Sequence, residues 1–136
     1  MAPYEIVEHT ADEGIRVTAA GLEPFFRDAA AGMFDIMCGG AVDGWDTQHH
    51  VSIQAADLED LLVDWLSELL YLFEVKKFIF QDAVFDSLHD TALEAKVTGL
   101  SFRGRLAGSE IKAVTYHLLD IRRVSGVYEA TVFFDL

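Results

Sequence analysis

The sequence has few of the residues that mark secreted or membrane proteins. It contains a single cysteine, Cys38, among 136 residues, so no disulfide can form within the chain. This cysteine usage is typical of a reducing cytoplasm. No apolar run approaches the roughly 20 residues that a helix needs to cross a bilayer. The first residues show neither the basic start nor the apolar segment of a signal peptide. We therefore expect a cytoplasmic protein that does not bind membranes.

Basic residues are also scarce. The chain has 10 Lys and Arg against 23 Asp and Glu, which gives a formal net charge of −13. Independent binding of a nucleic-acid backbone needs stripes of basic side chains, so the composition argues against it. A negative surface is compatible with binding cations or with docking onto a basic protein surface.

The residues that are abundant are apolar, and they predict one domain over 1–136 with two helices. Apolar residues make up 51% of the chain and include 10 Phe, enough for a core of ordinary size. Apolar positions recur at three- and four-residue steps over 22–38, with Pro24 in the first turn of this helix. A second helix follows Asp57, a favourable N-cap, and ends near Lys76 and Lys77, where the helix dipole favours cations.

The remaining ordered segments read as strands. Apolar and polar residues alternate in them, and Ser125 with Gly126 forms a two-residue turn between the last two. The order β-β-α-β-α-β-β-β-β predicts the α+β class. We expect a two-layer sandwich in which two helices pack on a mostly antiparallel or mixed sheet. The predicted strands lie at or near residues 4–9, 15–20, 50–55, 79–88, 92–102, 113–124 and 127–136.

Two acids at strand ends are candidate metal ligands. Asp12 lies between the first two predicted strands, in the stretch HTADEG, and Asp135 is the penultimate residue. Leu136, the last residue of the sequence, adds a terminal carboxylate. Such oxygens are ligands of hard divalent cations. If the three carboxylates converged, a metal would offset their repulsion. Spacing alone favours solvated strand-end acids, with the metal site as the alternative.

Other chemistry-bearing residues give weaker signals. The five histidines show neither the HxxxH nor the HxH spacing of a zinc pair. No nucleophile elbow, P-loop or GxGxxG motif is present. Cys38 lies near the end of an apolar helical pattern, which favours a buried structural thiol. Arg103 and Arg105 are typical of an exposed loop, with a phosphate contact as the alternative.

Four segments, in order and spanning nearly the whole chain, resemble the archease family. EHTADEGI at 8–15 resembles the family's E-H-T-A-D-x-G signature, and GSEIKAVTYH at 108–117 resembles its G-[ST]-E-[VI]-K-A-V-T-Y-H block. DLEDLLVDWLSELLYLFE at 57–74 resembles the family's long acidic and leucine-rich helix. The closing VFFDL resembles its apolar-Asp-apolar end. Together these motifs are highly specific.

The resemblance implies an accessory protein and not an enzyme. Archeases assist the RtcB-type RNA ligase, which joins RNA ends carrying a 2′,3′-cyclic phosphate or a 3′-phosphate to a 5′-hydroxyl. They promote guanylylation of the ligase and allow its multiple turnover in tRNA splicing and RNA repair. The family is also described as chaperone-like. Two alternatives remain: an acidic adaptor of RNA-processing proteins that requires no metal, and a small metal-dependent phosphoester hydrolase.

The resemblance also assigns the site. It places the metal ligands at Asp12, Asp135 and Leu136, with Ca²⁺ as the expected ion and Mg²⁺ or Mn²⁺ as alternatives. Glu13 departs from the family, which commonly has Ile at this position; it either strengthens cation binding or faces solvent. The loop 99–107 is shorter than in many members. Candidates for contact with the ligase or with phosphate are Glu13, Lys112, Tyr116 and His117. For Lys112, Tyr116 and His117 the alternative is that they only fix the strand.

Overall fold

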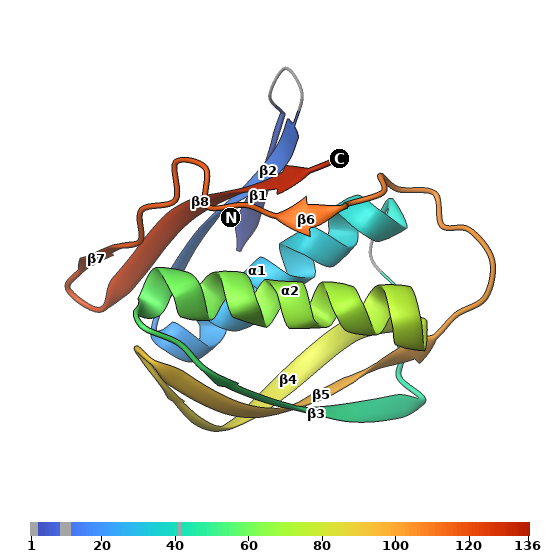
Figure 1. Ribbon diagram of the computed structural model, residues 1–136, viewed down its shortest axis with the longest axis horizontal. Helices are drawn as coiled ribbons and strands as arrows, with labels where there is room; N and C mark the ends of the chain where they lie inside the picture. Colours follow the sequence, from blue (N-terminus) through green and yellow to red (C-terminus); the bar gives the residue numbers. More distant parts are fainter. Residues whose placement is uncertain (1–2, 9–11, 41) are drawn as a thin grey trace.

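The computed structural model describes residues 3–8, 12–40 and 42–136 of the chain. Its two helices lie between two sheets, and each helix packs against both of them (Figure 1). The elements in chain order are β1 Tyr4–Glu8, β2 Asp12–Ala20, α1 Leu22–Cys38, β3 Thr47–Gln54, α2 Leu58–Lys76, β4 Phe78–His89, β5 Ala92–Ser101, β6 Ala113–Val114, β7 Arg122–Val124 and β8 Val127–Asp135.

The predicted α+β class, with two helices packed on antiparallel strands, is confirmed, but the strands are divided between two sheets. The first sheet has the order β1-β2-β8-β6, and β7 also pairs with β8. The second sheet has the order β3-β5-β4. Every pairing between described strands is antiparallel. Strands from both ends of the sequence therefore meet in the first sheet, on the opposite side of the helices from the second.

The strand predicted over 113–124 is wrong in its middle. β6 and β7 occupy only its two ends, and the segment between them runs past the beginning of α2 (Figure 1). Leu118 has a left-handed φ of 55°, which breaks the extended backbone. The amide of Ile121 donates to the Glu59 carboxylate of α2 at 3.2 Å instead of to a neighbouring strand. A helix side chain thus takes a hydrogen bond that a continuous strand would have given to β8.

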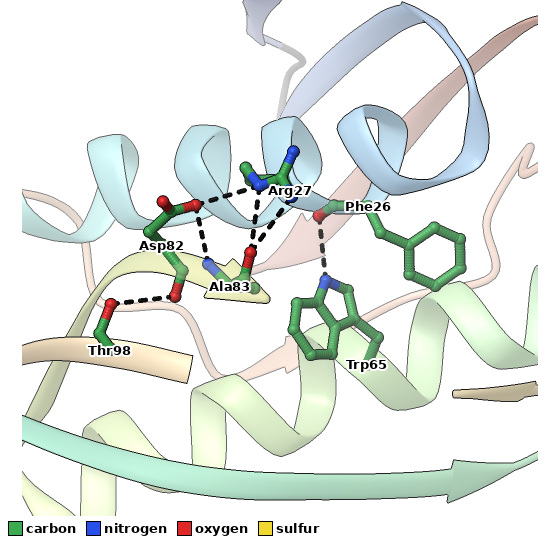
Figure 2. A network of polar contacts seen from close by, with 6 residues as sticks. All are labelled: Phe26, Arg27, Trp65, Asp82, Ala83 and Thr98. Carbon is green, nitrogen blue, oxygen red and sulfur yellow. Dashed lines mark hydrogen bonds and ion pairs between the residues drawn. The ribbon is translucent and has the colours of Figure 1, made fainter. Parts of the chain in front are cut away.

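The two helices are fixed to each other inside the core. The Asp57 side chain caps α2 as predicted, accepting a hydrogen bond from the Asp60 amide at 2.8 Å. Trp65 of α2 is fully buried, and its indole Nε1 donates to the Phe26 carbonyl of α1 at 3.0 Å (Figure 2). This bond satisfies the one polar atom of a large aromatic side chain. Neither helix of the described structure is long and apolar enough to span a membrane.

Arg27 ties α1 to the second sheet at an irregular point of β4. Its guanidinium donates from Nε and Nη2 to the Ala83 carbonyl and forms an ion pair with Asp82 at 3.0 Å (Figure 2). The pairing register of β4 with β5 shifts between Phe80 and Asp82. Arg27 therefore occupies the Ala83 carbonyl, while the Asp82 carboxylate accepts from the Ala83 amide at 2.8 Å, so neither group of this edge strand is open to pairing.

Candidate functional site

Asp12 and Asp135 lie directly opposite each other at one end of the first sheet. Asp12 is the first residue of β2, not part of a turn, and its partner in the antiparallel register with β8 is Asp135. Residues opposed in this way share a face, with Cβ atoms about 4.5–5.5 Å apart. Ile15 and Val132 are fully buried on the helix side of the same two strands. Alternation therefore places both carboxylates on the outer face, away from the helices.

The two carboxylates fit a hard divalent cation. Like charges opposed on neighbouring strands repel, and neither Asp12 nor Asp135 takes part in an ion pair among the described residues. The part of the chain that the structure describes holds no cluster of three His, Cys, Asp or Glu side chains. An ion here would take two side-chain carboxylates, a main-chain oxygen of Leu136 and water. This all-oxygen set suits Ca²⁺, Mg²⁺ or Mn²⁺.

Lys112 flanks Asp135 on the other side. Its amide donates to the Asp135 carbonyl at 2.7 Å, and the next residue, Ala113, is the register partner of Asp135 in β6. Asp135 is thus held between β2 and β6. The exposed Lys112 is bound to it through the main chain.

Gly14 explains the glycine of the HTADEG stretch. A Cβ on this residue would lie 2.6 Å from the Val132 carbonyl oxygen and 2.8 Å from Cδ1 of Phe133. The Phe133 ring therefore lies across Gly14 on the outer face and is only 7% exposed. The glycine lets an aromatic ring cover the sheet next to the carboxylate pair.

His117 lies on the same outer face, over the Phe133 ring. Their ring centroids are 5.8 Å apart. Thr115 fixes this arrangement, since its amide and its hydroxyl both donate to the Phe133 carbonyl, at 3.0 and 2.8 Å. The His117 amide in turn donates to the Thr115 hydroxyl at 3.3 Å. The exposed imidazole thus contacts β8 two residues before Asp135, closer to the start of the strand.

Tyr116 contacts α2. Partial burial raises the pKa of its hydroxyl, and so do a hydrogen bond with Asp60 and the nearby charges of Asp60, Asp64 and Asp57. The side chain is 54% exposed and fastens the loop between β6 and β7 to the first turns of α2. The structure therefore does not group Tyr116 with the carboxylate pair.

Glu13 points to the opposite side of β2 from Asp12. It follows Asp12 in a strand, so its side chain is directed toward the helix layer. There its Oε1 accepts a hydrogen bond from the Ser109 hydroxyl at 2.7 Å. Ser109 belongs to the GSE block, and sequence reasoning missed it. Local sequence patterns could not reveal this contact, because the two residues lie 96 positions apart in the chain.

The remaining candidates lie apart from this site. Burial and the Asp35 charge raise the pKa of Cys38 to about 11, as expected for an unreactive structural thiol. Arg105 lines a cleft of about 500 Å³ at the ends of the two helices. Lys77, Glu74 and Glu110 line it too, so its wall carries both signs of charge. His9, Thr10 and Ala11 lie outside the described residues.

Comparison with known proteins assigns the family. The model of the family described as "Archease protein family (MTH1598/TM1083)" matches residues 4–136. The chain belongs to the archease family. Protein archease of Methanosarcina acetivorans is 36% identical over 140 residues, which cover 98% of this chain and 95% of the relative. Protein archease of Methanothermobacter thermautotrophicus is 31% identical over the full length of both chains.

Two solved structures share the fold of this archease-family chain. The solution structure of protein 1598 of Methanobacterium thermoautotrophicum superimposes with a TM-score of 0.78 at 30% identity, covering all of both chains. A Thermotoga maritima crystal structure, described as an archease and possible chaperone, gives a TM-score of 0.69 at 25% identity. It covers 96% of this chain, and 94% of its own chain is matched.

Proposed function

We propose that this protein activates an RtcB-type RNA ligase by promoting ligase guanylylation and multiple turnover in tRNA splicing and RNA repair. In this proposal it is a non-enzymatic, cytoplasmic accessory protein that does not bind nucleic acid independently. The description of the Thermotoga maritima relative as a possible chaperone supports a role exerted on another protein. The net charge of −13 supports docking onto a basic surface, such as that of an RNA-binding enzyme.

The observation that carries the proposal is the opposed carboxylate pair. Asp12 and Asp135 face each other on a solvent-facing surface, and neither forms an ion pair within the described chain. Such a pair costs stability, so its presence calls for a ligand. In the proposal Asp12, Asp135 and a main-chain oxygen of Leu136 hold a divalent ion. Ca²⁺ suits this site because it tolerates irregular geometry and several water ligands.

The chemistry follows from this placement. A divalent ion supplies positive charge that offsets the charge on phosphoryl oxygens during transfer. Asp12 and Asp135 orient that charge outward, where a docked ligase can present its bound nucleotide. Lys112, whose amide binds the Asp135 carbonyl, adds a positive charge to this end of the sheet, and His117 beside the Phe133 ring offers a further partner contact.

The test is ligase guanylylation with charge-removing variants. Asp12→Asn and Asp135→Asn should each lower the stimulation of an RtcB-type ligase about tenfold or more, because each removes one of two side-chain ligands. Glu129→Gln is the matched control, since Glu129 is an exposed acid on the same face of β8 as Asp135. Full stimulation by both folded Asn variants would refute the proposed role of the pair. Turnover of phosphoesters by the isolated protein would instead indicate a hydrolase.

A further inference from the structure

The segment 108–112 contacts both strands that carry the carboxylate pair. At one end the Ser109 hydroxyl donates to Glu13 of β2 at 2.7 Å. At the other end the Lys112 amide donates to the Asp135 carbonyl of β8 at 2.7 Å. One short segment, 108–112, is therefore hydrogen-bonded to both of the strands that carry Asp12 and Asp135, next to these two residues.

This segment is itself anchored to the core. The Ser109 amide donates to the Ile36 carbonyl of α1 at 2.9 Å. A Cβ on Gly108 would collide with the backbone of Ile36 and Met37, so the chain lies directly against the end of α1. Ile111, between the two contact points, is 2% exposed. Packing on both sides leaves the Ser109 hydroxyl little freedom to follow a moving strand.

We infer that 108–112 is a clamp that holds Asp12 opposite Asp135, with Ser109 and Glu13 as positioning residues. Asp12 begins β2, and strand ends open more readily than strand centres. Repulsion between the opposed carboxylates favours that opening. The hydrogen bond that the Ser109 hydroxyl donates to Glu13 resists this opening from the other face of β2. The inference rests on the proposed function in one respect: the pair is taken to hold a divalent ion.

The clamp needs a hydrogen-bond acceptor at position 13, which the Glu13 carboxylate supplies. An alkyl side chain such as that of Ile could not accept the hydrogen bond of Ser109. Glu13 and Asp12 point to opposite faces of β2. Glu13 therefore positions the strand and does not bind the ion itself.

The test combines amide hydrogen exchange with Ca²⁺ affinity in the full chain. Ser109→Ala and Glu13→Ile should each speed exchange about tenfold at residues 12–15 and 133–135, as expected for loss of one part-buried hydrogen bond. Each should also weaken Ca²⁺ binding several-fold. The double variant should be no worse than either single variant, because both remove the same bond. Ser109→Thr and Glu13→Gln keep a donor or an acceptor and should retain slow exchange.

Three results would overturn the inference. The first is unchanged exchange at residues 12–15 in Ser109→Ala. The second is an equal acceleration in the second sheet, which would indicate a global loss of stability. The third is local acceleration with unchanged Ca²⁺ affinity, which would make the bond merely structural. If the wild-type protein bound no Ca²⁺, the metal site of the proposed function would fail, and the exchange data alone would decide whether the clamp exists.

Discussion

Two acidic regions of this protein use their carboxylates in opposite ways. At the start of α2, Asp57 caps the helix, Glu59 accepts the Ile121 amide and Asp60 contacts Tyr116. All three acids also lie where the helix dipole favours negative charge. At the end of the first sheet, Asp12 and Asp135 oppose each other without an ion-pair partner among the described residues. The contacts of each carboxylate thus distinguish acids that stabilise the fold from acids that do not.

The difference matters in a chain with 23 acidic residues. The number of nearby acids identifies no site, because the larger group, at α2, is already engaged by backbone and side-chain donors. The informative feature is an acid whose position costs stability and brings no contact in return. Such local conflicts are expected at functional sites. Among the residues that the structure describes, the carboxylate pair meets this description, whereas the capping and bonding acids of α2 do not.

A substitution at Gly14 should disrupt the packing beside the carboxylate pair. Gly14→Ala should lower the free energy of unfolding by about 1–3 kcal/mol, because the added methyl group meets the Val132 carbonyl and the Phe133 ring. Urea denaturation measures this loss. A change below about 0.5 kcal/mol, the range of ordinary surface substitutions, would show that the Phe133 ring does not lie across Gly14 as described.

Removing the N-cap of α2 tests the structural role of the acids at the start of this helix. Asp57→Ala should lower the free energy of unfolding by about 1 kcal/mol, since the Asp60 amide loses its acceptor. Ca²⁺ affinity should not change. Asp64→Ala is the matched control, because Asp64 is an exposed acid of the same helix without a capping bond, and it should change stability by less than about 0.5 kcal/mol. Equal losses in both variants would contradict the assignment of the cap.

The smallest predicted effect concerns the contact between Tyr116 and α2, and it is a change in the pKa of the Tyr116 hydroxyl. Partial burial and the bond with Asp60 raise the pKa of Tyr116, so the folded chain keeps this proton to higher pH than the unfolded chain. Its contribution to stability is complete below about pH 10 and is lost as pH rises above that value. Ultraviolet titration of wild type against Tyr116→Phe isolates the phenol, and Asp60→Asn should lower its pKa. A pKa that Asp60→Asn leaves unchanged would sink this assignment.

Local features of the fold were predictable from the sequence. Apolar periodicity located α1, and the N-cap preference of Asp57 located the start of α2. The Ser125-Gly126 turn was also correct, since both residues have the positive φ of a two-residue hairpin. These signals depend on neighbours in sequence, which is why periodicity and capping rules can detect them.

Features that depend on distant contacts were not predictable in the same way. Alternation does not say which strands pair, so the division into two sheets was missed. The interruption of 113–124 depends on a helix carboxylate that takes the Ile121 amide. The sequence allowed only the conditional statement that Asp12 and Asp135 could form a site if they came together. The reason is that β2 and β8 pair in the fold but lie at opposite ends of the sequence. Ser109 was missed for the same reason: its acceptor, Glu13, lies 96 residues away.

The most direct test of the account is calorimetric titration of the folded protein with Ca²⁺. We predict one site that weakens about tenfold or more in Asp12→Asn and in Asp135→Asn, with affinity unchanged in the matched Glu129→Gln control. Neither Asn variant should be less stable than wild type in the absence of the ion, because each relieves repulsion across the strands. Equal Ca²⁺ affinity in wild type and both Asn variants, or no binding by wild type, would contradict the account.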